Sequence, residues 1–328
     1  MTFPRNPRRP QRWARAAAAV SVAVALLGGC GGGTSQYEAF VAQRVIAFGD
    51  ESTAITSDGA KYSVNGTTAS TGANGDTVYT LNCSSNPNWV QVLAGLYGYV
   101  FAECNPDRVE RPQALMRATA GARVVDIQAQ VDAQIAAGGF RNKDLVAIMA
   151  GANDILDLYA QFPGRTESDI MAEVRSRGVR MAQQVNRLVD VGAKVIVSTV
   201  PDMGLTPYAV KQKAEFDDTD RAALLSRLTA AFNEQLAVNV LLDGRYIGFV
   251  QADLTVQAMV RVPAFYGFAN VTDAACASTV TLPACTDQTL NENASASAWL
   301  WADETRLGPS VHSQIGNLAV ARARNNPF

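Results

Sequence analysis

Three short polar stretches carry the side chains that could do chemistry in this chain. Residues 50–52 read Asp-Glu-Ser, residues 151–154 read Gly-Ala-Asn-Asp, and residues 303–312 run from an aspartate to a histidine. A serine, a histidine and a carboxylate are the groups of nucleophilic acyl transfer, in which the histidine takes the proton of the serine hydroxyl. His312 is the only histidine in the sequence, so a mechanism of this kind would depend on it.

The first two polar stretches each follow a short apolar run that predicts a buried β-strand. These runs cover residues 45–48 and 145–150, and two similar runs cover residues 194–200 and 246–250. Charged residues do not interrupt them, as is typical of parallel strands that are covered on both faces. The polar stretches therefore lie at the carboxyl ends of predicted strands, where open α/β sheets bind their ligands.

Helical spacing separates the predicted strands. Strand and helix alternate along the chain, which predicts a doubly wound, mainly parallel sheet in a three-layer α/β/α sandwich. In the last helix, Ile315, Leu318 and Ala319 are expected to face inward. The predicted helices cover residues 124–135, 170–188, 224–236 and 310–323.

Two segments break this alternation. Residues 53–82 are rich in Gly, Thr, Ser and Asn, and predict an irregular insertion or a β-hairpin near the site. Residues 268–292 form a second irregular stretch. After it, Trp299 and Trp301 share one face of a strand-like segment, so one of them could line a cleft, although tryptophan more often occupies a core or a rim.

The polar stretches, taken in order, resemble the blocks of the SGNH/GDSL ester hydrolases over essentially the whole mature chain. The Gly-Asp-Ser block of that family corresponds to residues 47–52, its second glycine block to 118–122, and its Gly-x-Asn-Asp block to 151–154. Its closing Asp-x-x-His block corresponds to residues 303–312. The resemblance implies the doubly wound fold predicted above, an ester hydrolase mechanism, and no cofactor.

The resemblance also implies roles for single residues. The N–H of Gly121 and the side-chain amide of Asn153 would stabilise the oxyanion, an effect worth about 3–4 kcal/mol for each donor. Asp303 would orient the base. Three further residues of the matched blocks are expected at the site: Asp50, Gly151 and Asp154.

Two residues depart from the family pattern at the positions of the nucleophile and the base. Glu51 replaces the serine after Gly49-Asp50, and Arg306 replaces the histidine three residues after Asp303. An arginine stays protonated and cannot act as a general base. Because serine and histidine touch in the family, Glu51 and Arg306 are expected to form an ion pair, with Asp303 as a second acceptor for Arg306.

A displaced triad is the alternative that would keep catalysis. Ser52 lies one residue after the nucleophile position, and His312 lies six residues after the base position. With Asp303 they supply the three required side chains. The geometry is unfavourable, because a shift of one residue after a strand turns the side chain by roughly 100–180°.

Two functions are therefore open. The first is an ester hydrolase acting on acylated carbohydrate, lipid or a small ester. The second is a non-catalytic descendant that binds an acyl or carbohydrate ligand in the former cleft or serves the cell envelope. A nucleotide-binding protein is excluded, because no G-x-G-x-x-G motif follows the first strand.

The N-terminus is a targeting segment. Residues 1–29 contain five arginines and an apolar run, 16–27, that is shorter than the roughly 20 residues of a membrane-spanning helix. The run ends in Leu-Gly-Gly-Cys, which resembles a bacterial lipobox, so Cys30 is expected to carry a lipid anchor. We therefore expect a signal peptide over 1–29, a lipidated tether over 30–36 and one domain over 37–328, with the outer membrane as the location.

The net charge and the cysteine content agree with an exported protein, either a binding protein or an enzyme. Without residues 1–29 the chain has 23 basic and 30 acidic side chains, a net charge of −7, which excludes an electrostatic case for nucleic-acid binding. Four cysteines allow three disulfide connectivities, of which we favour the local pairs Cys83–Cys104 and Cys276–Cys285. A metal site is not expected, because the chain has no C-x-x-C motif and a single histidine.

Overall fold

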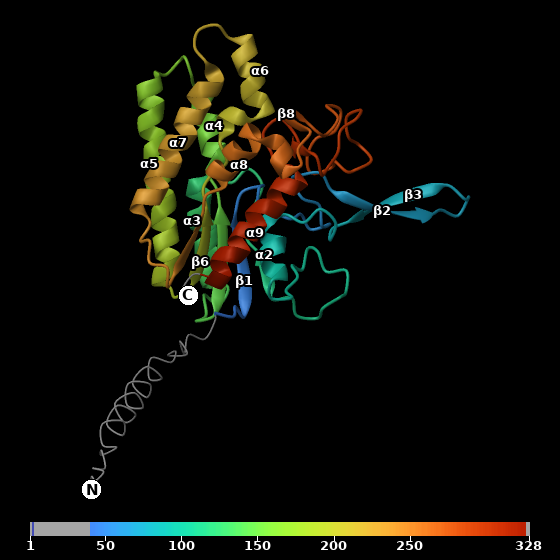
Figure 1. Cartoon of the computed structure of the whole chain (residues 1–328), viewed down its shortest axis with the longest axis vertical. Coiled ribbons are helices and arrows are strands. Elements are labelled where there is room, and N and C mark those ends of the chain that lie inside the picture. Colours follow the sequence, from blue (N-terminus) through green and yellow to red (C-terminus); the bar gives the residue numbers. More distant parts are fainter. Residues whose placement is uncertain (1, 3–39, 326–328) are drawn as a thin grey trace. The chain divides into compact units, whose positions relative to one another are not determined.

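Five parallel strands form the central sheet of the computed structural model, which describes residue 2 and residues 40–325 (Figure 1). The strand order is β4-β1-β5-β6-β7, and β1 pairs with β5 along its whole length. The predicted apolar runs and the predicted doubly wound α/β fold are confirmed. The strands of this sheet are β1 (Arg44–Gly49), β4 (Ala114–Met116), β5 (Asp144–Met149), β6 (Lys194–Ser198) and β7 (Ile247–Val250).

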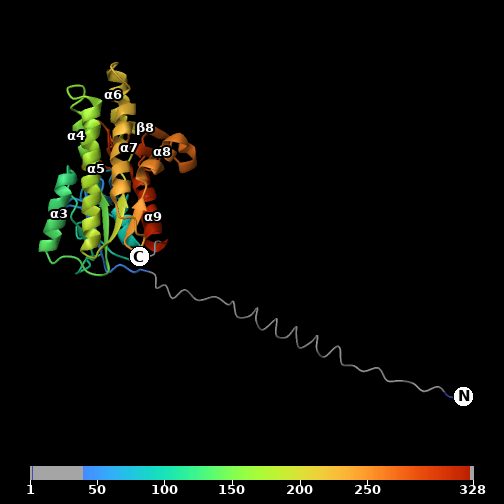
Figure 2. The ribbon, with the colours of Figure 1, turned by 90° about the vertical axis from the view of Figure 1, so that its left-hand side faces the viewer.

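One face of the sheet is covered by a layer of helices that pack on alternate strand residues such as Phe48 and Val146. These strand side chains meet Ile127, Val174 and Phe232 from three different helices. Figure 2 shows this layer from the side. Its helices are α3 (Val124–Ala136), α4 (Ala152–Tyr159), α5 (Glu167–Asp190) and α7 (Arg221–Asn239), with η1 (Met203–Leu205) and α6 (Pro207–Glu215) leading into α7.

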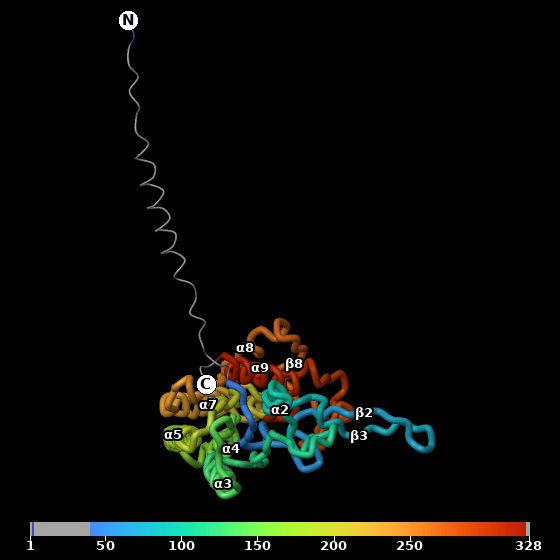
Figure 3. Tube along the Cα trace, turned by 90° about the horizontal axis from the view of Figure 1, so that it is seen from below, coloured from blue at the N-terminus to red at the C-terminus, as the bar shows by residue number. Residues whose placement is uncertain are grey.

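The opposite face is covered by α2 (Trp89–Gly95), α8 (Ala252–Arg261) and α9 (Pro309–Asn325), with η2 (Pro263–Tyr266) after α8. Seen from below in Figure 3, α2, α8 and α9 lie on one side of the sheet and α3 and α5 on the other.

The inward orientation predicted for Leu318 is wrong, since this residue is 40% exposed. The buried stripe of α9 repeats every four residues, so that Leu318 lies beside the stripe while Ile315 and Ala319 lie within it, as predicted. The stripe consists of Val311, Ile315, Ala319 and Ala323.

Two additions extend the sandwich beside the carboxyl ends of the strands. The segment 53–82 contains the predicted hairpin, formed by β2 (Gly66–Thr71) and β3 (Thr77–Asn82), which projects from the body of the protein (Figures 1 and 3). The segment after η2 contains β8 (Asn270–Ala274), which pairs with β9 (Trp299–Trp301) across a long loop. Both predicted disulfides are formed: Cys83–Cys104 joins the end of the hairpin segment to the loop between α2 and β4, and Cys276–Cys285 lies between β8 and β9.

No helix in the part of the chain that the structure describes is long and apolar enough to cross a membrane. Except for residue 2, the signal peptide predicted over 1–29 lies outside the described residues. The predicted tether with Cys30 lies outside them too. Their prediction is taken up below as a proposal.

Candidate functional site

Two glycines at the ends of β1 and β5 create the backbone turns on which the site is built. Gly49 has φ +136° and Gly151 has φ +129°, conformations that side chains with a Cβ rarely adopt. A Cβ on Gly49 would lie 2.1 Å from the carbonyl oxygen of Met149. The amide of Gln130 on α3 holds this turn, because it binds both the N–H and the carbonyl oxygen of Gly49 at 2.9 Å. Sequence reasoning missed Gln130.

The Glu51 carboxylate lies at the centre of the site and is almost fully buried, with 5% of the residue exposed. Its Oε1 accepts from Arg306 Nη2 at 2.5 Å, so the predicted ion pair is present. Its Oε2 accepts from the N–H of Gly121 at 2.8 Å and from Asn153 Nδ2 at 2.9 Å. The two residues expected to stabilise an oxyanion are thus brought together, and both bind Glu51.

These contacts keep Glu51 ionised. Burial acts to raise the pKa of Glu51, but Arg306 and the two N–H donors outweigh burial, and the pKa lies below its usual value. Burial likewise acts to lower the pKa of Arg306, and the charges of Glu51 and Asp303 reverse this and hold it protonated. The centre of the site is therefore a carboxylate–guanidinium pair.

Asp50 lies beside this pair and is 1% exposed. Burial raises the pKa of Asp50 to about 8, and the neighbouring charge of Glu51 adds to the effect. Asp50 therefore favours its protonated form at neutral pH. Glu51 then carries the charge in direct contact with Arg306, and Asp303 adds a second charge nearby. The Oδ1 of Asp50 accepts from the N–H of Ser52 at 2.9 Å, as expected of an aspartate that stabilises a turn.

Asp303 does not act as a second acceptor for the Arg306 guanidinium, so that prediction is wrong. Its Oδ1 accepts instead from the backbone N–H of Thr305 at 2.8 Å and of Arg306 at 2.7 Å. This is the turn geometry that a short carboxylate favours, in which it satisfies the N–H groups two and three residues later. Asp303 thereby fixes the backbone that presents Arg306, and its charge still favours the protonated guanidinium.

The structure does not bring the displaced triad together. Within the described residues, no hydrogen bond joins His312 to Ser52 or to Asp303. His312 is 2% exposed, lies in α9, and its Nδ1 has no hydrogen-bond partner in the described part of the chain. Burial, together with the nearby charge of Lys61, lowers the pKa of His312 to about 4.

We expect His312 to make the fold sensitive to acid. Its pKa is about 4 in the folded protein and about 6.5 for an exposed histidine, so the unfolded chain takes up the proton first as pH falls. This one group should cost about 2 kcal/mol of unfolding free energy between pH 7 and pH 5. Urea unfolding of the parent and of His312→Gln at both pH values measures the difference, and parallel pH dependence in the two proteins would contradict it.

Asp154 contacts neighbouring helices and does not line the pocket. Its Oδ2 accepts from the N–H of Val124 at 2.9 Å at the start of α3, and its Oδ1 forms an ion pair with Arg177 of α5 at 3.3 Å. Asp154 is 2% exposed, and burial raises the pKa of its carboxyl group. Asp154 therefore joins α3, α4 and α5 behind Asn153.

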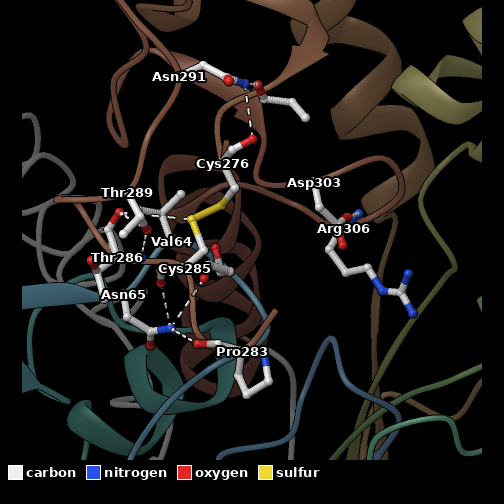
Figure 4. The surroundings of a disulfide bond; sticks show 12 residues. Val64, Asn65, Cys276, Pro283, Cys285, Thr286, Thr289, Asn291, Asp303 and Arg306 are labelled. Carbon is white, nitrogen blue, oxygen red and sulfur yellow. Dashed lines mark hydrogen bonds between the residues drawn. A yellow bond between two sulfur atoms is a disulfide. The ribbon is translucent and has the colours of Figure 1, made fainter. Parts of the chain in front are cut away.

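A pocket of about 350 Å³ opens above the ion pair. The loop closed by Cys276–Cys285 forms one wall, and Asn65 anchors this loop through hydrogen bonds from Nδ2 to the carbonyl oxygens of Pro283 and Cys285 (Figure 4). Tyr62 belongs to the segment 53–82 that was predicted to lie near the site, whereas the place of the 276–285 loop in the site was not predicted. The lining residues are Glu51, Tyr62, Ala120, Gly121, Ala274, Cys276, Ala277, Ser278, Val280, Thr281, Leu282, Asp303, Glu304 and Arg306.

Within the described residues, no group of three or more His, Cys, Asp or Glu side chains is placed to hold a metal ion.

The family model described as GDSL-like lipase/acylhydrolase matches residues 37–315. A GDSL esterase/lipase of Arabidopsis thaliana is 25% identical over 141 residues, which are 41% of this chain and only 37% of that protein. An acetylxylan esterase of Geobacillus stearothermophilus superposes with a TM-score of 0.43 and 12% identity, over 87% of this chain and 95% of that chain. An α/β hydrolase from the metagenome of Lake Arreo, Spain, gives a TM-score of 0.43 and 15% identity, over 88% and 98%.

Proposed function

Because the chain belongs to the GDSL-like lipase/acylhydrolase family, we propose that it is a member without serine-hydrolase activity that binds an acyl or carbohydrate ligand in its cleft. The observation that carries this proposal is the position of the Glu51 carboxylate. Its Oε2 takes both the Gly121 N–H and the Asn153 amide, the donors that an ester hydrolase of this family needs for the oxyanion.

Three further features argue against ester hydrolysis at this site. Glu51 is neutralised by Arg306 and accepts two more hydrogen bonds, so it is a weak nucleophile and a weak base. Arg306 cannot take up a proton. Ser52 has no histidine base: both its N–H and its side chain form hydrogen bonds with Asp50, and His312 lies in the interior.

The pocket retains the means to bind a ligand. Arg306 has five N–H donors, and within the described residues only Glu51 and Thr305 accept from them. The remaining donors can bind a carbonyl or hydroxyl oxygen of a ligand in the pocket of about 350 Å³. The apolar wall made by Val280 and Leu282 suits an acyl group or the apolar face of a sugar.

Labelling with a fluorophosphonate tests the absence of an activated serine. The mature protein should give no covalent adduct by intact mass, under conditions in which a serine esterase reacts completely. An adduct mapped to Ser52 would instead establish an activated nucleophile and overturn the proposal.

We propose in addition that the protein is exported and anchored by lipid at Cys30, with 1–29 removed, 30–36 as a tether and one domain over 37–328. The lipobox-like Leu-Gly-Gly-Cys and the arginine-rich leader support this, and the residue after Cys30 favours the outer membrane. Labelling of cells with a radioactive fatty acid should mark the parent and not Cys30→Ala. Equal labelling of both proteins would exclude the anchor.

A further inference from the structure

A second cavity of about 380 Å³ lies directly beside the pocket above the ion pair. We call the pocket at Arg306 the inner compartment and this second cavity the outer compartment. The two share four lining residues, so they lie next to each other. The shared residues are Ala274, Cys276, Ser278 and Glu304.

The outer compartment combines one aromatic side chain with several hydrogen-bonding groups. Trp299 of β9 is partly exposed there, whereas Trp301, two residues later, is fully buried. Thr272, Asp273 and Asn291 line the same cavity. An indole face beside hydroxyl, carboxylate and amide groups suits a polyhydroxylated ring, whose C–H face packs on the aromatic ring while its hydroxyls form hydrogen bonds.

Asn291 is held in place for such a contact. Its Nδ2 donates to the carbonyl oxygens of Ala274 at 2.9 Å and Cys276 at 3.0 Å (Figure 4). These bonds fix the amide, while its Oδ1 accepts no hydrogen bond within the described residues. The side chain is therefore an oriented acceptor for a ligand hydroxyl, with little conformational entropy left to lose on binding.

The ionisable groups of the outer compartment already have partners within the protein. Lys211 of α6 forms an ion pair with Glu304 at 2.6 Å. The Asp273 carboxylate accepts from Asn270 Nδ2 at 2.8 Å but has no cation beside it among the described residues. In this part of the chain the compartment therefore has no unpaired cation for an anionic ligand, and its Asp273 oxygens can accept from ligand hydroxyls.

We propose that the two compartments together bind a neutral oligosaccharide. One sugar ring stacks on Trp299 in the outer compartment, and the next lies in the inner compartment within reach of the free donors of Arg306. The inference rests on the proposed function, because it places the ligand in the same cleft, and it adds a stacking residue and a requirement for at least two sugar units.

The mature protein provides its own optical probe for this contact. It contains three tryptophans, of which Trp89 and Trp301 are 0% exposed, so Trp299 alone is placed to respond to a ligand. Titration with xylotetraose, cellotetraose and chitotetraose, and with their monosaccharides, should change the fluorescence for at least one tetrasaccharide. The tetrasaccharide should bind at least about tenfold more tightly than its monosaccharide.

Two variants separate the stacking role from a general effect on the fold. Trp299→Ala should weaken tetrasaccharide binding, measured by calorimetry, at least about tenfold. Phe265→Ala removes an aromatic side chain that is 83% exposed and lies outside the cleft, and should leave the tetrasaccharide affinity unchanged. Unchanged affinity in Trp299→Ala, or no binding of any of the three tetrasaccharides, overturns the inference.

Failure of the proposed function has a different signature. Release of acetate from an acetylated xylo-oligosaccharide by the parent protein would show that the site is catalytic, while the dependence on Trp299 and on chain length would still hold. Absence of hydrolysis with affinity independent of Trp299 would leave the proposed function intact and reject the outer compartment as a sugar site.

Discussion

Replacing Arg306 with alanine should lower the unfolding free energy at pH 7 by about 2–4 kcal/mol. The Glu51 side chain is 4% exposed, and without Arg306 its charge would be buried with no opposite charge beside it. The N–H groups of Gly121 and Asn153 would still bind Glu51, so the loss should not exceed this range. Urea unfolding of both proteins gives the difference.

Acid should relieve the defect of Arg306→Ala. In this variant burial acts on Glu51 without the opposing guanidinium, so its folded pKa should rise above that of the unfolded chain. A raised folded pKa contributes stability at low pH that is lost as pH increases. The difference in unfolding free energy between parent and variant should therefore be smaller at pH 4.5 than at pH 7.

Arg227→Ala provides the matched control. Arg227 forms a pair with Glu167 at 2.7 Å, but these side chains are 46% and 38% exposed. Its loss should cost less than about 1 kcal/mol, as for exposed ion pairs in general. An equally small cost for Arg306→Ala would mean that the buried pair does not stabilise the fold.

The double change Glu51→Ser and Arg306→His should create esterase activity. Removing the carboxylate frees the Gly121 N–H and the Asn153 amide for an oxyanion, and a single donor of this kind is worth about 100- to 1000-fold in rate. The new serine and histidine occupy positions whose present side chains already touch. We expect p-nitrophenyl acetate hydrolysis at least about 100-fold above the parent, and fluorophosphonate labelling at position 51.

Each single variant should remain inactive, because neither a serine without a base nor a base without a nucleophile catalyses the reaction. Glu51→Ser alone retains Arg306, which cannot accept a proton. A double variant that unfolds at the parent's temperature and yet gives neither hydrolysis nor labelling would show that more than these two residues separates this site from an ester hydrolase.

The sequence predicted those parts of the molecule that depend on local pattern. Apolar runs ending in glycine located β1 and β5, and short separations indicated both disulfides. The Glu51–Arg306 contact was predictable because two substitutions fell on positions that touch in the family.

The remaining parts of the site depend on contacts that no local pattern encodes. Glu51 reaches Gly121 only because residue 119 is fixed on β1 by the bond from Thr119 N–H to the Gly49 carbonyl oxygen, 3.1 Å long. The glutamate side chain is longer than that of a serine, so it reaches the N–H of Gly121 and the amide of Asn153, which a serine would leave free. The role of Asp303 was missed because its local turn competes with the more distant guanidinium.

The separation of Glu51 and Arg306 by 255 positions also bears on how the molecule reaches its native state. Contacts between residues so far apart require a large loop to close, and folds dominated by such contacts form slowly. The strand that precedes Glu51, β1, lies inside the sheet between β4 and β5, both of which follow it in the chain. An emerging chain therefore holds β1 without a neighbour until β4 is complete at residue 116, and without its second neighbour until β5 is complete at residue 149. The ion pair can close only after residue 306 is present.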